Sequence, residues 1–312
     1  MQKSFTPDLG HLRTLREVQE RGTVTAAADA LHLTPSAVSQ QIAALAQSVG
    51  APLLARSGRR IRLTAQAHVL LEHLDLINAE LERARADLDA FALGEVGRVG
   101  VAAFATAITG LVVPTLSILG RSHPGLTITV EEVEAPACFS RLDAGTIDIA
   151  IAVDYARGPR RDDPRYQRVE LLRDPLRVVV PDGHPASFQE AVDIAQLAED
   201  GWVIGADDHP CYAITMAAYA AASITPRIVH RTNDWGAAIA LVASGSGIAL
   251  VPALALTRKH AGIAVLPVRG QEPARTIYAA VRRGSEEALR IRLVLDVLSS
   301  VAARLRQPDK PR

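Results

Sequence analysis

The chain has 312 residues, of which 48% are apolar and 22% are charged, and its 34 basic and 34 acidic side chains leave no net charge. This composition is typical of a folded protein and excludes disordered, collagen-like and disulfide-scaffold classes. The length is sufficient for roughly two domains. Zero net charge excludes a globally basic protein that coats nucleic acid, but it allows one basic domain.

The sequence predicts neither export nor membrane insertion. The first ten residues lack the apolar core of a secretory signal. The longest uncharged stretch, residues 236–257, contains Gly245 and Pro252 near its middle. It therefore predicts a helix, a turn and a buried strand. The two cysteines, Cys138 and Cys211, are expected to be reduced thiols. We expect a cytoplasmic protein without a membrane partner.

The N-terminal region contains a stretch without carboxylates. Residues 31–71 hold no Asp or Glu, yet they include Arg56, Arg59, Arg60 and Arg62. Such a segment predicts a locally basic surface, for which a polyanion is the expected partner.

Two short helices joined by a tight turn are predicted in this region. Residues 25–33 form an Ala-rich helix, and a second helix spans residues 36–48. Thr34 is suited to cap the second helix and Pro35 to begin it. An upstream helix at residues 9–21 covers both, and the pattern is that of a helix-turn-helix. The apolar face of the second helix consists of Val38, Ile42 and Leu45.

A short hairpin is predicted next. Leu53 and Leu54 precede a Ser-Gly turn at residues 57–58, and Ile61 and Leu63 follow it. Arginines occupy the tip, so the hairpin has the character of a basic wing.

A long helix follows, with Thr64 as its N-cap and glycines at its end. Its apolar residues recur in steps of four and three, the heptad pattern of a helix that buries one seam. We expect the seam to pair with a second copy of the chain; packing on the chain's own domain is the alternative. The seam consists of Leu70, Leu74, Ile77, Leu81, Ala84, Leu88 and Phe91.

From residue 96 onward, predicted strands and helices alternate, which indicates a parallel sheet with helices on both faces. We expect two α/β lobes, residues 95–168 together with 269–312, and residues 169–268, with a ligand cleft between them. The predicted strands are residues 96–104, 127–133, 147–153, 176–181, 227–231, 248–252 and 276–281. The predicted helices are residues 106–122, 136–144, 211–222, 234–244 and 286–305.

Several phrases match a known family. The N-terminal phrases are Gly22-Thr23-Val24-Thr25-Ala26-Ala27-Ala28, Leu31-His32-Leu33-Thr34-Pro35-Ser36-Ala37-Val38-Ser39-Gln40-Gln41-Ile42 and Leu63-Thr64. Those further along are His123-Pro124-Gly125, Gly145-Thr146-Ile147-Asp148-Ile149-Ala150-Ile151 and Val242-Ala243-Ser244-Gly245-Ser246-Gly247-Ile248. In this order, over the whole chain, they resemble the signature of the LysR-type transcriptional regulators. Ala46 and Leu54 depart from the family's usual Glu and Phe.

The resemblance implies an α/β multidomain protein with three parts. These are a winged helix-turn-helix DNA-binding domain (1–65), a dimerisation linker helix (66–94) and a two-lobed α/β effector domain resembling periplasmic binding proteins (95–312). It implies a regulator that binds specific DNA sequences and whose activity is controlled by a small-molecule effector of unknown identity. Its expected partners are operator DNA, further copies of itself (a dimer and then a tetramer) and RNA polymerase.

The recognition helix is expected to enter the major groove with its first turn against base edges. We expect Ser39 and Gln40 to contact bases, with Gln41 as the alternative to Gln40. Other residues on or near that turn are Thr34, Pro35 and Ser36.

The phosphate contacts are expected on both sides of this helix. Thr23 and Thr25 begin the preceding helix, where hydroxyls and free N–H groups suit phosphate binding. Arg56, Arg59 and Arg60 on the wing suit phosphates or a narrow minor groove.

The effector is expected at the carboxyl ends of the strands, where helix N-termini point into the cleft. Thr106 is the strongest single candidate, and Asp207 is suited to an amino group, although a solvated loop is the alternative. The full set is Ala105, Thr106, Ala107, Pro136, Asp207, His209, Cys211, Asn233 and Trp235.

Two alternative functions remain open from the sequence. Cys138 and Cys211 each begin a predicted helix, which can lower a thiol pKa, so a redox-sensing regulator is one alternative. A metabolite-binding protein without sequence-specific DNA readout is the other. No catalytic constellation, metal-ligand cluster or cofactor motif stands out, so we expect no enzyme activity, metal or cofactor.

Overall fold

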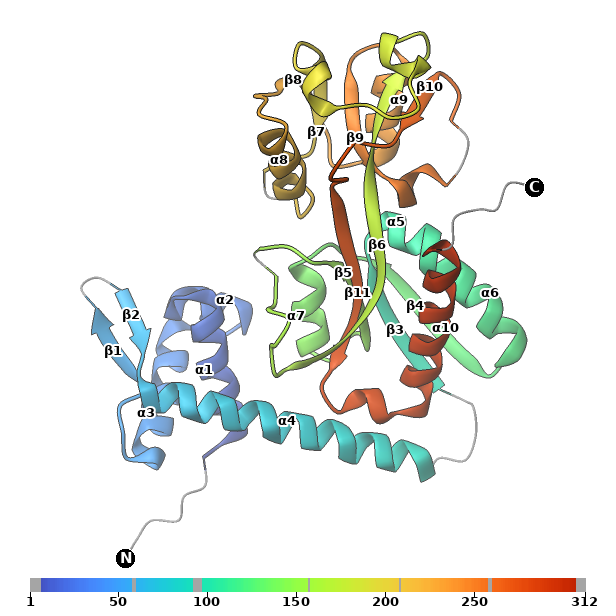
Figure 1. Ribbon diagram of the computed structural model, residues 1–312. Helices are drawn as coiled ribbons and strands as arrows, with labels where there is room; N and C mark the ends of the chain where they lie inside the picture. The colour runs from blue at the N-terminus through green and yellow to red at the C-terminus, as the bar shows by residue number, and fades with distance from the viewer. Residues whose placement is uncertain are drawn as a thin grey trace, which may run out of the picture. The chain divides into compact units, whose positions relative to one another are not determined.

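The computed structural model describes residues 7–57, 60–91, 97–156, 158–207, 209–257 and 260–306. The chain divides into two compact units, Met1–Ala84 and Arg85–Arg312. The boundary between them lies within the long helix at residues 65–91 (Figure 1).

Three helices form the body of the N-terminal unit: α1 (Leu9–Arg21), α2 (Val24–Ala30) and α3 (Pro35–Val49). Side-chain oxygens of Thr23 and Thr34 accept hydrogen bonds from backbone N–H groups at the starts of α2 and α3. These N-caps satisfy donors that have no partner within the helix. The predicted apolar face of α3 is buried against α1 and α2, so the helix-turn-helix is confirmed.

The predicted hairpin is also present, because β1 (Leu54–Ser57) pairs antiparallel with β2 (Arg60–Leu63). Its tip, residues 58–59, lies outside the described residues. The long helix α4 (Ala65–Phe91) follows, and the hydroxyl of Thr64 accepts from the backbone N–H of Ala67.

The first part of the predicted seam is occupied within this unit. Leu70 and Leu74 are 9% and 1% exposed and belong to the core formed with α1 and α3. This part of the seam therefore packs on the chain's own domain and not on a second copy, as the alternative prediction had it. An ion pair between Arg16 and Asp75 (2.5 Å) adds a polar link between α1 and α4. The later seam residues Ile77, Leu81 and Leu88 are 39%, 50% and 71% exposed. Ala84 is exposed as well, and the side chain of Phe91 lies outside the described residues.

The C-terminal unit contains two α/β lobes on one sheet, whose strand order is β4-β3-β5-β11-β6-β9-β7-β8, with β10 also paired to β6. The strands are β3 (Gly97–Ala103), β4 (Leu126–Glu132), β5 (Ile149–Val153), β6 (Tyr166–Pro181), β7 (Gly201–Ile204), β8 (Arg227–Arg231), β9 (Ile248–Pro252), β10 (Ile263–Leu266) and β11 (Ala274–Arg282).

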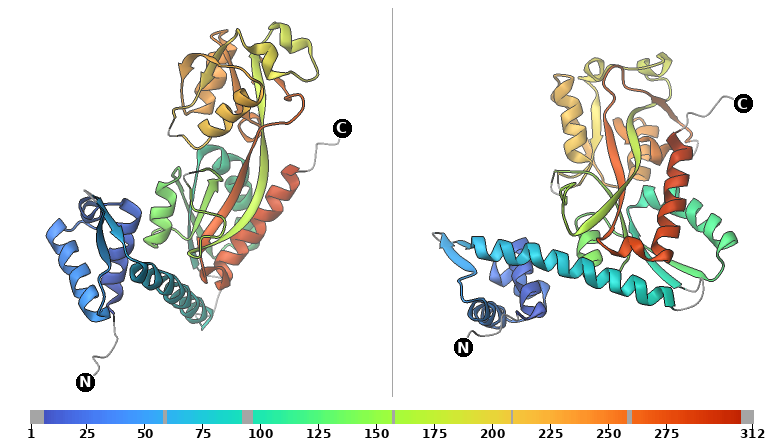
Figure 2. Two further views of the ribbon diagram at one scale, coloured as in Figure 1. Left: turned by 60° about the vertical axis from the view of Figure 1, so that its left-hand side comes forward. Right: turned by 60° about the horizontal axis from the view of Figure 1, so that its bottom comes forward.

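The sheet is mixed, which corrects the expectation of a parallel one. β3 pairs parallel with β4 and β5, and β7 pairs parallel with β8 and β9. β6 and β11, in contrast, run antiparallel to each other and to their other neighbours. The reason is that the chain leaves the first lobe along β6 and returns along β11, in the opposite direction. Figures 1 and 2 show these two long strands side by side between the lobes.

The expected lobe boundary at residues 168–169 lies inside β6, which has 16 residues and contributes to both lobes. Helices cover both faces of each part of the sheet and enclose separate apolar cores. They are α5 (Ala105–Ala107), the π-helical turn η1 (Ile108–Val112), α6 (Val113–Ser122), α7 (Ala137–Asp143), α8 (Tyr212–Ala221), α9 (Trp235–Ala243) and α10 (Leu289–Arg306). Short 3-10 turns are η2 (Pro185–Phe188), η3 (Ile194–Leu197), η4 (Ala253–Leu256) and η5 (Ser285–Glu287).

Membrane-like apolar segments are part of these cores. The uncharged stretch at residues 236–257 forms α9, a turn, β9 and η4, as predicted. The helical run Ala105–Ser122 is long and apolar enough to cross a membrane by composition, but Leu111, Val112 and Leu119 are buried in the core of the first lobe.

Candidate DNA interface and lobe junction

The first turn of α3 presents a polar surface opposite its buried face. Thr34, Pro35, Ser36, Ser39 and Gln40 are all exposed. Thr34 Oγ1 caps the helix at the N–H of Ala37 (3.2 Å) and lies 3.0 Å from the hydroxyl of Ser36. The Ser39 hydroxyl donates to the Pro35 carbonyl (2.8 Å), which leaves its oxygen lone pairs outward as acceptors.

Gln40 and Gln41 lie in different environments, which distinguishes the two alternatives. The Gln41 amide oxygen accepts from the hydroxyl of Thr14 on α1 (2.5 Å), and Thr14 is only 3% exposed. Gln40 is exposed and makes no side-chain hydrogen bond within the part of the chain that the structure describes. Gln41 therefore connects α3 to α1, and Gln40 is the glutamine whose amide is exposed.

Thr23 and Thr25 lie at the start of α2, both exposed. Thr23 is the N-cap, with its hydroxyl 3.1 Å from the N–H of Ala26. The other N–H groups of this first turn lack helical partners and point outward along the helix axis. This geometry suits a phosphate oxygen.

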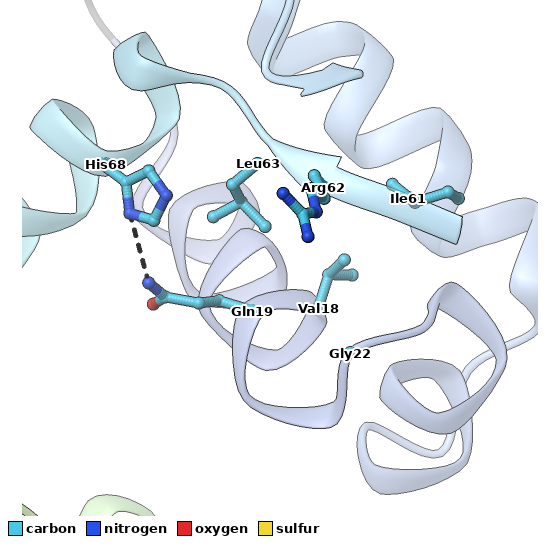
Figure 3. A pocket seen from close by; sticks show the side chains of 7 residues that line it. All are labelled: Val18, Gln19, Gly22, Ile61, Arg62, Leu63 and His68. Atoms are coloured by element: carbon cyan, nitrogen blue, oxygen red, sulfur yellow. Dashed lines mark hydrogen bonds between the residues drawn. The ribbon is translucent and has the colours of Figure 1, made fainter. Parts of the chain in front are cut away.

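The wing arginines are only partly described. The side chains of Arg56 and Arg60, and all of Arg59, lie outside the described residues, so their expected contacts stay predictions. Arg62 on β2 is exposed. It lines a pocket of about 400 Å³ between α1, the wing and the start of α4 (Figure 3). In this pocket His68 lies 3.5 Å from the amide nitrogen of Gln19.

In the C-terminal unit, the predicted Thr106 and Cys211 meet at a charged pair that the sequence did not reveal. Arg275 Nη2 donates to Thr106 Oγ1 (2.9 Å), and Arg275 Nη1 lies 3.6 Å from Cys211 Sγ. The same guanidinium donates through Nε to Asp174 (2.9 Å), and its carbon lies 4.9 Å from the centre of the Phe104 ring. Thr106 therefore lies where the two lobes join.

The other second-lobe candidates form a neighbouring group. Asn233 Oδ1 accepts from the N–H of Ala206 (2.8 Å), which ties the ends of β7 and β8 together. His209 Nδ1 accepts from the N–H of Cys211 (3.2 Å), and its ring meets Trp235 edge-on at 6.1 Å.

His209 also provides a polar contact to the first lobe. Its Nε2 atom lies 4.0 Å from Glu134, a carboxyl that the sequence analysis did not single out. Burial raises the pKa of Glu134 above its ordinary value. Of the remaining candidates, Ala105, Pro136 and Asp207 are exposed and Ala107 is buried.

The two cysteines occupy different surroundings. Cys138 is fully buried in the core of the first lobe with Phe139, Tyr166 and Tyr278. It therefore does not face a cleft, although the start of its helix was predicted to point into one. Burial raises the pKa of its thiol to about 12. Burial also raises the pKa of Cys211, against the opposing effect of Arg275. Both shifts favour the unreactive thiol.

Comparison with family models assigns both units. Residues 9–68 match the bacterial regulatory helix-turn-helix protein model of the lysR family, and residues 92–303 match the LysR substrate binding domain. The chain belongs to the LysR family of bacterial transcriptional regulators. This LysR-type regulator therefore combines a DNA-binding unit with an effector-binding one, which favours regulation over metabolite binding without DNA readout.

Known proteins resemble the regulator over nearly its whole length. TcbR from Pseudomonas sp. strain P51 is 28% identical over 289 residues, which cover 91% of this chain and 95% of TcbR. The structure of CbnR bound to its target DNA has a TM-score of 0.57 at 27% identity, covering 95% of this chain and 99% of CbnR. A full-length OxyR variant from Pseudomonas aeruginosa has a TM-score of 0.62 at 20% identity, covering 98% of this chain and 99% of OxyR, a likeness of fold.

Three residues at this junction of the LysR-type regulator were not among the candidates predicted from the sequence: Arg275, Asp174 and Glu134. Arg275 and Asp174 are the buried charges of two strands whose other buried residues are apolar or aromatic, although both strands also carry more exposed charges. A charge in such a strand is a signal, because it must find a partner on folding. The identity of the partner, 101 residues away, requires the strand register.

Proposed function

We propose that the regulator reads its operator with the exposed first turn of α3, using Gln40 and Ser39 for bases and Thr34, Pro35 and Ser36 around them. Thr23 and Thr25 contact phosphates at the start of α2, and Arg56, Arg59 and Arg60 contact the backbone from the wing. The observation that carries this proposal is the exposed, unengaged Gln40 amide beside its engaged neighbour Gln41. A glutamine amide can bind adenine through two hydrogen bonds.

The test is selection of bound sequences from a random duplex pool with the full-length protein. We expect the wild type to enrich a pseudo-palindromic site. Gln40→Ala should lose about 1–3 kcal/mol of discrimination at one base position of each half-site. Gln41→Ala is the matched control, because it should lower stability through loss of the Thr14 contact and leave the selected sequence unchanged. Equal enrichment by wild type and Gln40→Ala would refute this assignment.

We propose in addition that two chains pair through the later seam of α4, at the exposed Ile77, Leu81, Ala84 and Leu88 and at Phe91, whose side chain lies outside the described residues, and that dimers associate into tetramers on DNA. Paired recognition helices then meet two half-sites. The protein works in the cytoplasm, catalyses no reaction, and has RNA polymerase as a further partner.

A small-molecule effector of still unknown identity binds at the lobe junction around Thr106, with Ala105, Ala107 and Pro136 from the first lobe. Asp207, His209, Cys211, Asn233 and Trp235 contribute from the second lobe. Differential affinity for two arrangements of the lobes would shift their populations and thereby change DNA binding. A thermal-shift screen of small metabolites tests this: a true effector should raise the melting temperature of the wild type and not that of Thr106→Val. A ligand that stabilises both proteins equally binds elsewhere.

A further inference from the structure

Arg275 and Asp174 form an ion pair on the two strands that connect the lobes. They are direct partners in the antiparallel register of β11 and β6. Their side chains are 2% and 1% exposed, and Arg275 Nη2 lies 2.9 Å from Asp174 Oδ2. A charged pair so completely removed from water is stable only with good geometry and further hydrogen bonds.

Those further hydrogen bonds come from both lobes. On the first-lobe side, Arg275 donates to the Thr106 hydroxyl at the start of α5. On the second-lobe side, the N–H of Leu254 in η4 donates to Asp174 Oδ1 (3.0 Å), and Arg275 contacts Cys211, the N-cap of α8. One ion pair thus joins α5, η4 and α8 to the connecting strands.

Leu254 strengthens the connection by packing. Its side chain is 4% exposed and belongs to the apolar core of the first lobe, although η4 follows a strand of the second. It lies against Gly110 of η1, where any Cβ atom would overlap it. The backbone of Leu254 is therefore held by Asp174 while its side chain packs against η1, which directly follows α5.

The hydrogen bond from Arg275 also occupies one of the two acceptor sites of the Thr106 hydroxyl. Because Thr106 Oγ1 already accepts from Arg275, its own proton remains to be donated to another acceptor. The positive charge of the guanidinium, which is paired with Asp174, favours this orientation of the hydroxyl.

We propose that Arg275 is a positioning residue that couples the effector site to the arrangement of the lobes. It orients Thr106 to donate to an oxygen acceptor of the effector, such as a carboxylate or carbonyl. It links any displacement of α5 to η4 through Asp174 and to α8 through its own contact with Cys211. The ligand part of this inference rests on the proposed binding of an effector at Thr106; the coupling of the lobes does not.

Coupling can be measured without effector or DNA by double electron–electron resonance. Nitroxide labels are attached at Ser117→Cys on α6 and Ala240→Cys on α9, both exposed, while the native cysteines are buried. An excess of unlabelled protein restricts the signal to distances within one chain. We expect the wild type to give a single narrow lobe-to-lobe distribution.

The decisive variant replaces the pair together, Arg275→Met with Asp174→Leu. Removing both charges from a buried pair is often neutral or stabilising, so this protein should fold. The single variant Asp174→Leu, in contrast, should melt on the order of 10 °C lower because it leaves Arg275 unpaired. We expect the double variant to lose the narrow distribution. An unchanged distribution would overturn the proposal.

Two further proteins complete the test. Arg282→Met with Asp148→Leu removes an ion pair confined to the first lobe (3.5 Å) and should leave the lobe-to-lobe distribution as in the wild type. Thr106→Val removes the hydrogen bond of Arg275 to the first lobe, leaves its contact with the Phe104 ring, and should broaden the distribution even if the double variant fails to fold. A distance distribution that broadens in Arg282→Met with Asp148→Leu, but not in Arg275→Met with Asp174→Leu, would also count against the proposal. Because no effector is present, these outcomes are separate from failure of the effector screen.

Discussion

Cys138 and Cys211 are the chain's two thiols, and their burial decides whether oxidation can act as a signal. The thiolate is the reactive form of cysteine, and its fraction falls tenfold for each unit by which the pKa exceeds the pH. Burial raises the pKa of Cys138 to about 12 and raises that of Cys211 as well. We therefore infer that both thiols are structural, contrary to the redox-sensing alternative.

This inference predicts that the native protein resists iodoacetamide at pH 8. Both cysteines should be alkylated only after unfolding, as counted by intact mass. Peroxide should change the operator affinity of neither the wild type nor Cys211→Ser. A peroxide response in the wild type that Cys211→Ser abolishes would instead restore the redox-sensing interpretation.

The pairing of Arg275 with Asp174 at the lobe junction could not be predicted from the sequence. Thr106 and Cys211 could be proposed because they follow predicted strands or begin predicted helices. Arg275 could not, because its role depends on lying opposite Asp174 in the register of β11 and β6. That register forms only when two segments 101 residues apart pair on folding.

At the scale of elements, the ends of the three helices α1 to α3 could be predicted to within three residues. Their caps are local: Thr23 and Thr34 satisfy N–H groups three residues onward, and Gly22 and Gly50 end helices in the left-handed conformation. Of β6, only residues 176–181 could be predicted, because Arg168, Arg173 and Asp174 interrupt the apolar pattern of the strand. In the folded chain these three side chains contact neighbouring strands and the lobes, and these contacts offset the cost of placing charges in the strand.

The helix α4 changes its role along its length, which predicts different effects for two of its leucines. Leu74 is 1% exposed in the core of the N-terminal unit, so Leu74→Ala should cost about 2–5 kcal/mol of that unit's stability. Leu81 is 50% exposed, so Leu81→Glu should leave stability nearly unchanged. It should raise the dimer dissociation constant by about tenfold or more, since a charge at a heptad seam opposes pairing.

Sedimentation equilibrium and urea unfolding together check both effects. If Leu81→Glu remained as dimeric as the wild type, the exposed later seam would not be the pairing surface. If Leu74→Ala weakened the dimer without lowering stability, the division of roles along α4 would be wrong.

At the scale of the whole molecule, the zero net charge conceals a local basic surface, and this determines how salt acts on DNA binding. Each phosphate contact by a cationic side chain releases counterions, so the slope of log K against log salt counts contacts near the DNA rather than the total charge of the chain. Residues 31–71 contain no carboxylate, and Arg62 within them is exposed beside the pocket under the wing.

Two arginine variants separate local charge from total charge. Arg62→Gln and Arg98→Gln each change the formal net charge from 0 to −1, but Arg98 is an exposed residue of β3 in the other unit. We expect Arg62→Gln to reduce the magnitude of the salt slope by about 0.9 for both operator and random duplex, since a phosphate contact carries no sequence information. Arg98→Gln should leave the slope unchanged, as measured by fluorescence anisotropy across a salt series. Equal effects of the two variants would mean that total charge governs binding; no effect of either would place Arg62 outside the interface, leaving the wing tip and α2 as the sources of phosphate contact.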